Sequence, residues 1–206
     1  MRISVLQHAG FEHAGILRDF MRDDGIAFDV TALDEGDPLP KLDKYDALIV
    51  LGGPMAPLDY DSHPWLASET ELVRQAVAER ALPTLGICLG HQLIAQALGG
   101  SLSLLEKTEV GVVDITLNEA GKRDPLFAGL EATSPGLQWH DWQIGELPPG
   151  AIPLARSAGC AIQAMRAAPR AWGVQFHIET CASTVSEWLE PPGHEEELQK
   201  HLGPDA

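Results

Sequence analysis

A cysteine set between two glycines, where an apolar run meets a helix-patterned run, is the feature that most constrains this fold. The motif G-I-C-L-G-H-Q spans Gly86 to Gln92, and Cys88 is its third residue. A strand that turns sharply into a helix and exposes a reactive side chain is a nucleophile elbow, and glycines allow such a turn. The N-terminus of the following helix would favour a thiolate at Cys88. Cys88 is therefore a candidate nucleophile, with a buried inert cysteine as the alternative.

The runs around this turn predict an α/β protein. Short continuous apolar runs are typical of strands buried on both faces of a parallel sheet, and apolar residues at 3.6-residue spacing predict helices. Strands are expected at Ile3–Leu6, Phe28–Val30, Ala47–Leu51 and Pro83–Cys88, and helices at Glu12–Asp24, from Pro64 to Arg80 and at His91–Leu98. This alternation predicts three layers, with a mostly parallel central sheet covered by helices on both faces.

After Gly100 the pattern changes. Strand candidates at Val110–Leu117, Ala161–Arg166 and Ala171–Phe176 follow one another without long helices between them, which predicts an antiparallel edge to the sheet. The length of 206 residues suits one domain, so we expect a single domain over residues 1–206. Residues from about 191 to 206 are expected to form a C-terminal tail with a short helix.

Composition excludes several classes of function. The formal net charge of −16 opposes binding to phosphate backbones, so no nucleic-acid partner is expected. Three cysteines do not form a disulfide framework, and no apolar stretch approaches the roughly 18 residues of a membrane span. We therefore expect a cytoplasmic protein without a membrane partner. Neither H-E-x-x-H nor C-x-x-C occurs, so no metal or other cofactor is predicted.

A second motif, Q-F-H-I-E, spans Gln175 to Glu179 at the end of a predicted strand. His177 and Glu179 are two residues apart, so in extended backbone their side chains point the same way. The carboxylate of Glu179 would then hold the His177 ring in one tautomer while the ring takes a proton from a thiol. The alternative is a histidine at a strand end beside a surface glutamate.

A third motif, L-G-G-P, spans Leu51 to Pro54 and ends another apolar strand. The N–H groups of Gly53 and of Leu89, the residue after the candidate nucleophile, are suited to bind a tetrahedral oxyanion. Taken alone, Gly-Gly-Pro is also a common loop. All three motifs lie at the carboxyl ends of predicted strands, where sites form in open α/β sheets.

The three motifs, in this order, resemble the class I glutamine amidotransferase family over nearly the whole chain, from Ile3 to about Trp188. The resemblance implies a flavodoxin-like domain that hydrolyses the side-chain amide of glutamine through a γ-glutamyl thioester and releases ammonia. It implies that Cys88 is the nucleophile, His177 the acid and base, and Glu179 the residue that orients His177.

The resemblance also suggests residues that bind the substrate. Gln92 would contact the bound glutamine. The GMP-synthetase-like branch of the family has a Glu-x-Gly motif, matched here by Glu109 and Gly111, and a His-acid pair, matched by His140 and Asp141. Asp141 would hold the substrate ammonium, although a solvated loop acid is the alternative.

The sequence leaves the fate of the ammonia open. It has neither an ATP-pyrophosphatase Ser-Gly-Gly-x-Asp-Ser loop nor a P-loop, so the acceptor of the ammonia would be a separate synthetase. A partner-independent γ-glutamyl hydrolase or peptidase would need the same residues. A redox-sensing cysteine protein without amidase activity, and a binding module with a relic site, are further alternatives.

Overall fold

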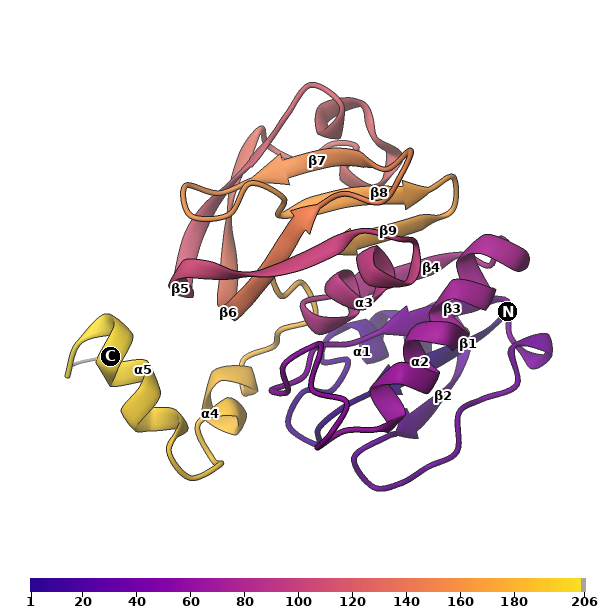
Figure 1. Cartoon of the computed structure of the whole chain (residues 1–206), viewed down its shortest axis with the longest axis horizontal. Helices are drawn as coiled ribbons and strands as arrows, with labels where there is room; N and C mark the ends of the chain where they lie inside the picture. Colours follow the sequence, from indigo (N-terminus) through magenta and orange to yellow (C-terminus); the bar gives the residue numbers. More distant parts are fainter. Residues whose placement is uncertain (205–206) are drawn as a thin grey trace.

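The computed structural model describes residues 1–204, which form a nine-stranded mixed sheet with helices on both faces (Figure 1). The strands are β1 Arg2–Gln7, β2 Ala27–Ala32, β3 Ala47–Val50, β4 Thr84–Ile87, β5 Ser101–Leu117, β6 Thr133–Glu146, β7 Ile152–Arg156, β8 Ala164–Ala168 and β9 Ala171–Val174. The helices are α1 Leu17–Asp23, α2 Trp65–Arg74, α3 Leu89–Ala97, α4 Thr184–Trp188 and α5 His194–Leu202, and a π-helical turn, Gln75–Glu79, extends α2.

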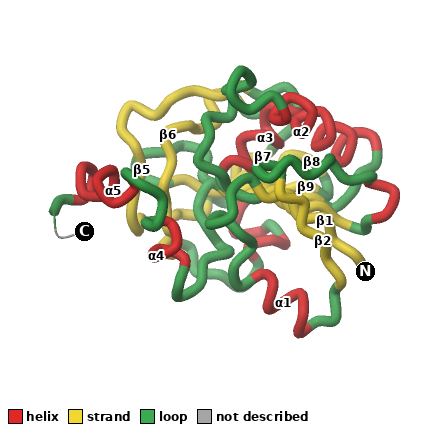
Figure 2. Tube along the Cα trace, turned by 90° about the horizontal axis from the view of Figure 1, so that it is seen from below, coloured by secondary structure: helices red, strands yellow, loops and turns green. Residues whose placement is uncertain are grey.

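Helices α2 and α3 lie on one side of the sheet and α1 lies on the other (Figure 2). The side chains of β3 alternate between the two cores that result. Leu48 and Val50 pack in the core under α2 and α3, whereas Ile49 and Leu51 pack in the opposite core. Both sets are buried because β3 is an inner strand, which explains its continuous apolar run. The α/β, three-layer fold class predicted from the sequence is confirmed.

The strand order is β2-β1-β3-β4-β9-β8-β7-β5-β6. Pairing is parallel from β2 to β9 and antiparallel from β9 to β6. Strand β4 therefore has β3 on one side and β9 on the other, although β9 comes more than eighty residues later in the chain. The carboxyl ends of these three parallel strands, each followed by one of the sequence motifs, meet at one edge.

The first helix is shorter than predicted. Glu12–Asp24 was expected to be helical, but α1 begins at Leu17 and the preceding residues form turns. Gly15 has a positive φ of 43°, which is incompatible with a continuous right-handed helix. The next N–H, that of Ile16, donates a 2.8 Å hydrogen bond to the Glu179 carbonyl, which ties this loop to the end of the chain segment after β9.

The antiparallel part of the sheet is larger than predicted. Strand β5 starts at Ser101 rather than at Val110, and the strand expected at Ala161–Arg166 lies at Ala164–Ala168. Strands β6 and β7 were not predicted. Pro135 and Gly136 interrupt the strand-like sequence pattern of β6, and Pro153 interrupts that of β7. Proline and glycine inside such a pattern usually indicate a loop or an edge strand. No helix within residues 1–204 has both the length and the apolar composition needed to cross a bilayer.

The turn between β4 and α3 is the sharp elbow that its glycines predicted. Cys88 has φ 51° and ψ −106°, an unfavourable backbone conformation for a residue with a side chain. A Cβ atom at Gly90 would lie 2.1 Å from the Val50 carbonyl oxygen, and one at Gly86 would lie 2.4 Å from the Gly90 oxygen. Helix α3 therefore begins close against β3, and only glycine permits that approach.

We expect Gly90→Ala to lower the free energy of unfolding by about 1–3 kcal/mol or more, because its Cβ would overlap a backbone oxygen that cannot move aside. Gly10→Ala is the matched control, since a Cβ there has no atom within 4 Å. Chemical denaturation of both variants tests this. Equal stability of the two would contradict the close packing of α3 on β3.

Candidate active site

A pocket of about 220 Å³ opens at the carboxyl ends of the parallel strands. Of the residues suggested by the sequence, the lining contains Gly53, Cys88, Leu89, Gln92, His140 and Asp141. The rest of the lining is mainly aromatic and acidic or belongs to the loop after β3: Phe11, Glu12, Pro54, Met55, Ala56, Pro57, Trp139, Trp142, Trp188, His194 and Glu197. The motifs at the ends of β3 and β4 therefore face one cavity.

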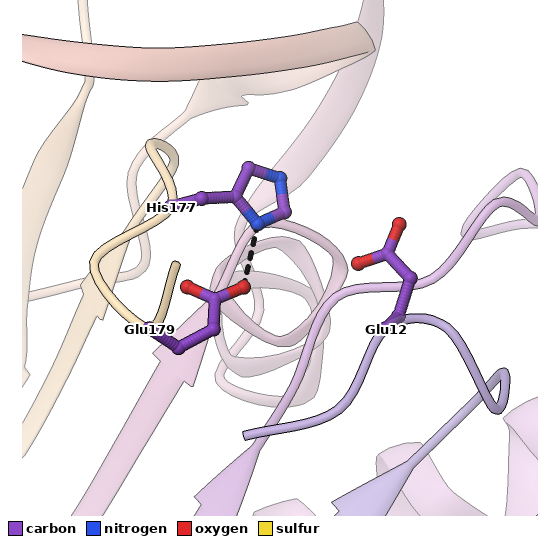
Figure 3. Close-up of side chains that lie close together, drawn as sticks. All are labelled: Glu12, His177 and Glu179. Atoms are coloured by element: carbon purple, nitrogen blue, oxygen red, sulfur yellow. Dashed lines mark hydrogen bonds and ion pairs between the residues drawn. The ribbon is translucent and has the colours of Figure 1, made fainter. Parts of the chain in front are cut away.

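The Q-F-H-I-E motif forms the predicted histidine–carboxylate pair. His177 Nδ1 and Glu179 Oε1 are 2.6 Å apart, and both residues are almost completely buried (Figure 3). The backbone N–H of His177 donates a 3.0 Å hydrogen bond to the Leu137 carbonyl of β6, which fixes the backbone of the motif. Trp188, a residue of the pocket lining, packs edge-on against the His177 ring with a centroid distance of 4.5 Å.

The surroundings of His177 favour its charged form. Burial alone would lower the pKa of His177, but the charge and hydrogen bond of Glu179, together with the charge of Cys88, raise it well above its ordinary value. An imidazolium next to a sulfur is suited to exchange a proton with it. The structure thus brings Cys88, His177 and Glu179 together, although the pocket lining includes only Cys88.

Two glutamine side chains link the sulfur to the antiparallel part of the sheet. Gln175 Nε2 donates to Cys88 Sγ over 3.6 Å, and Gln92 Nε2 donates to Gln175 Oε1 at 3.1 Å and to the Trp142 carbonyl at 2.9 Å. The amide nitrogen of Gln92 is therefore fully used within the protein. Sequence reasoning assigned no role to Gln175, although it is the first residue of the motif that contains His177.

The N–H groups of Leu89 and Gly53 have no hydrogen-bond acceptor within residues 1–204. Leu89 is the first residue of α3, where N–H groups have no partner inside the helix. The next N–H, that of Gly90, donates to the Leu51 carbonyl at 3.1 Å. Both Leu89 and Gly53 line the pocket together with Cys88, as expected for the predicted oxyanion donors.

Glu109 lies behind the pocket rather than in its lining. Its carboxylate accepts hydrogen bonds from Ser157 Oγ at 2.5 Å and Gln163 Nε2 at 2.6 Å, and it lies 3.1 Å from His140 Nε2. Burial raises the pKa of Glu109, but the hydrogen bonds from His140 and Ser157 outweigh this and lower it. The network orients His140, whose Nδ1 lies 2.8 Å from the Trp142 carbonyl.

Gly111 of the Glu-x-Gly motif and Asp141 of the His-acid pair lie in different places. Gly111, with φ 94°, lies against Leu202 of α5 and outside the pocket lining. Asp141 is exposed, accepts a hydrogen bond from Thr108 and lines the pocket. Of the residues that the resemblance suggested for substrate binding, the structure thus brings Gln92, His140 and Asp141 to the cavity, and neither Glu109 nor Gly111.

Glu12 is a third carboxyl group at His177 that sequence reasoning did not assign. It comes from the loop after β1, and its carboxyl group lies beside the His177 ring and near Glu179 (Figure 3). Within residues 1–204, Glu12, His177 and Glu179 are the one group of three potential metal ligands, with donor atoms within 4.8 Å of one another. Glu12 Oε2 is buried without a hydrogen-bond partner. A Cβ at Gly52 would lie 2.3 Å from this oxygen, so a larger residue there would displace the Glu12 carboxyl group.

Sequence and structure comparisons identify similar proteins. The family model "Glutamine amidotransferase class-I" matches residues 16–190. YfeJ, a glutamine amidotransferase-like protein of Salmonella typhimurium, is 35% identical over 189 residues, which cover 90% of this chain and 78% of that protein. A subunit of the glutamine-hydrolyzing GMP synthase of Sulfurisphaera tokodaii is 30% identical over 185 residues, 87% of this chain and 89% of that one. The crystal structure of a glutamine amidotransferase from Thermotoga maritima superposes with a TM-score of 0.88 at 28% identity, covering 97% of this chain and 84% of that chain.

We expect Glu12→Gln to stabilise the protein at neutral and alkaline pH. Burial raises the pKa of Glu12 above its ordinary value of 4.5, more than the charge of His177 lowers it. The folded state then holds a proton that the unfolded state releases, so stability falls as pH rises from 4.5 toward the folded pKa. Glutamine removes this loss, and the expected gain at pH 8 is about 0.5–2 kcal/mol.

Thermal unfolding between pH 4 and pH 8 measures this effect, and the gain should vanish toward pH 4. Glu35→Gln, at an exposed position, is the matched control and should change stability by less than about 0.5 kcal/mol. A Glu12→Gln protein that is less stable than the wild type at pH 8 would show that the Glu12 charge stabilises the fold.

Proposed function

Because this chain belongs to the class-I glutamine amidotransferase family, we propose that it hydrolyses the side-chain amide of glutamine through a thioester on Cys88. The observation that carries the proposal is the buried 2.6 Å hydrogen bond between the His177 ring and Glu179. The charge of the nearby Cys88 helps to raise the pKa of that ring. A thiol, a base beside it and a carboxylate that orients the base are the groups that nucleophilic catalysis needs.

In the proposed first half-reaction, the Cys88 thiolate attacks the side-chain carbonyl carbon of glutamine. The carbon–sulfur bond forms while the carbonyl π electrons move onto oxygen. The N–H groups of Leu89 and Gly53 stabilise that oxyanion, since neither has an acceptor within residues 1–204. The imidazolium of His177 then gives its proton to the amide nitrogen, the carbon–nitrogen bond breaks, and ammonia leaves.

In the second half-reaction, His177 is neutral and takes a proton from water. The hydroxide attacks the thioester carbon, the same two N–H groups hold the second oxyanion, and the carbon–sulfur bond breaks to release glutamate. Glu179 keeps one nitrogen of the His177 ring occupied throughout, so the other nitrogen faces the reacting atoms. The protons balance, because the proton taken from water returns the ring to its charged form.

Three side chains are candidates for holding glutamine. Both N–H donors of Gln92 are used within the protein, so its Oε1 atom is the one suited to accept a hydrogen bond from the substrate. Asp141 supplies a carboxylate at the pocket wall for the substrate ammonium. His140, fixed by Glu109, supplies a further polar group at the same wall.

We further propose that the released ammonia serves a separate synthetase. A relative that matches 87% of this chain is named as one subunit of a glutamine-hydrolysing GMP synthase, and that name supports such a role. The pocket volume, about 220 Å³, is below the roughly 300–1,000 Å³ of most ligand sites, so it suits glutamine better than a larger γ-glutamyl compound.

The thioester mechanism predicts selective labelling of Cys88 by the diazoketone analogue of glutamine. Mass spectrometry of the digested protein should find the adduct on Cys88 alone. Burial raises the pKa of Cys160 to about 11, so that thiol should not react, and Cys181 lies outside the pocket lining. Cys88→Ala should remain folded and lose about 10⁴–10⁶-fold in ammonia release.

Iodoacetamide, which does not resemble glutamine, is the control reagent. It should alkylate Cys181 as well, because hydrogen bonds from Ser183 and Thr184 lower the pKa of that half-buried thiol. An adduct of the glutamine analogue on Cys181 or Cys160 instead of Cys88 would contradict the proposed nucleophile.

The proposed role as an ammonia supplier predicts a preference among substrates. For the isolated chain, we expect kcat/KM for glutamine to exceed that for γ-glutamylglycine by at least about tenfold, because the small pocket leaves little room for the second residue. Ammonia and glycine release, measured side by side, test this. Faster cleavage of the peptide would indicate a partner-independent γ-glutamyl hydrolase.

A further inference from the structure

The peptide between Gly52 and Gly53 is held from behind the pocket by a buried ion pair. His8 directly follows β1 and is completely buried, as is Glu69 of α2. His8 Nδ1 lies 2.7 Å from the Gly52 carbonyl oxygen, and His8 Nε2 lies 2.8 Å from Glu69 Oε1. A carbonyl oxygen can only accept, so His8 Nδ1 must carry the hydrogen and donate it.

Helix α2 prevents the His8 ring from turning. Trp65 and Glu69 are four residues apart, so they share one face of the helix. Trp65 stacks on the His8 ring with a centroid distance of 5.6 Å and an interplanar angle of 11°. Burial lowers the pKa of His8, but the charge and hydrogen bond of Glu69 more than offset it, and the raised pKa favours the ring that carries a proton on both nitrogens.

We propose that His8 and Glu69 are positioning residues that aim the Gly53 N–H into the pocket as one of the two oxyanion donors. The inference rests on the proposed function. It follows from the geometry of a trans peptide, in which the C=O of one residue and the N–H of the next point in opposite directions. Residues 1–204 contain no cis peptide bond. Holding the Gly52 oxygen toward His8 therefore directs the Gly53 N–H to the other side of the peptide plane.

Within residues 1–204, His8 is the one hydrogen-bond donor to the Gly52 carbonyl. The preceding carbonyl, that of Leu51, accepts from the Gly90 N–H, but it belongs to another peptide. Glycine at positions 52 and 53 gives the backbone the freedom to flip. Without the His8 donor, the Gly52 carbonyl would be left buried and unpaired, and a flip would turn it toward the pocket in place of the Gly53 N–H.

The test compares His8→Leu with His8→Asn. Leucine removes the donor, whereas the amide nitrogen of asparagine can replace His8 Nδ1 and donate to the same carbonyl. Three readouts are needed: steady-state glutamine hydrolysis, the affinity for the aldehyde analogue of glutamine, and the rate at which iodoacetamide alkylates Cys88. The thiolate adds to the aldehyde carbon, the carbonyl π electrons move onto oxygen, and that oxygen occupies the oxyanion site while the His177 imidazolium balances its charge, so the tetrahedral adduct uses the oxyanion donors. Alkylation needs the thiolate alone.

For His8→Leu we expect kcat to fall about 10²–10³-fold with a change in KM of less than about threefold, as for the loss of one oxyanion donor. Affinity for the aldehyde should fall by the same factor, while Cys88 alkylation, quantified by mass spectrometry, should stay within about twofold. His8→Asn should restore kcat and aldehyde affinity to within about tenfold of the wild type.

Glu69→Gln provides a second variant that preserves shape, should His8→Leu fail to fold. It leaves a neutral His8 whose Nδ1 still donates, so we expect a loss in kcat and in aldehyde affinity of only about tenfold, as for the loss of charge from one hydrogen bond.

Three results would overturn the inference. His8→Leu with unchanged kcat and aldehyde affinity would show that the peptide orients itself. A fall in Cys88 alkylation equal to the fall in aldehyde affinity would show a general disturbance of the site. A wild-type protein that neither releases ammonia nor binds the aldehyde would refute the proposed function, and with it the need for an oxyanion donor.

Discussion

The parallel pairing of β4 with β3 and β9 is the constraint on which the site depends. It places the segment after β9 beside the start of α3, although the two are separated by the whole antiparallel part of the chain. Cys88 follows β4, His177 follows β9, and the Gly52–Gly53 peptide follows β3. Any shift of β9 relative to β4 would separate the sulfur from the imidazole. The long antiparallel strands also help to hold His177 in place, because the Leu137 carbonyl of β6 accepts a hydrogen bond from the backbone N–H of His177.

The site concentrates buried ionisable groups that a stable core would avoid. There are two buried ion pairs, His8 with Glu69 and His177 with Glu179. Burial raises the pKa of Glu12, which lies close enough to both histidines for their charges to lower it in part. Desolvating such groups offsets much of what their attraction gains, so they are weak evidence for stability. Their value lies in fixing proton positions and ring orientations. In each pair the carboxylate occupies one nitrogen of the histidine, and the other nitrogen of His8 lies 2.7 Å from the Gly52 carbonyl oxygen.

The sequence was informative where function depends on local motifs. The elbow at Cys88 and the pair of His177 and Glu179 depend on residues within a few positions, so their spacing predicted both arrangements. The roles of His8, Glu69 and Gln175 depend on contacts across 44 to 87 residues, which no local pattern records. Strand β6 was missed for another reason. Its Pro135 and Gly136 indicate a loop, but the pairing with β5 overrides that local preference.

The two unused N–H groups beside Cys88 are fixed by different means. The Leu89 N–H belongs to the first turn of α3, whose close approach to β3 depends on Gly90, so its direction is set by the packing of a whole helix. The Gly53 N–H belongs to the loop after β3, where we propose that the hydrogen bond from His8 to the neighbouring Gly52 carbonyl sets its direction. The proposed nucleophile and the first proposed donor are thus built into the same elbow, whereas the second proposed donor depends on α2 through His8. A site divided in this way can keep a reactive sulfur while its capacity to stabilise an oxyanion changes, because the two properties depend on separate contacts.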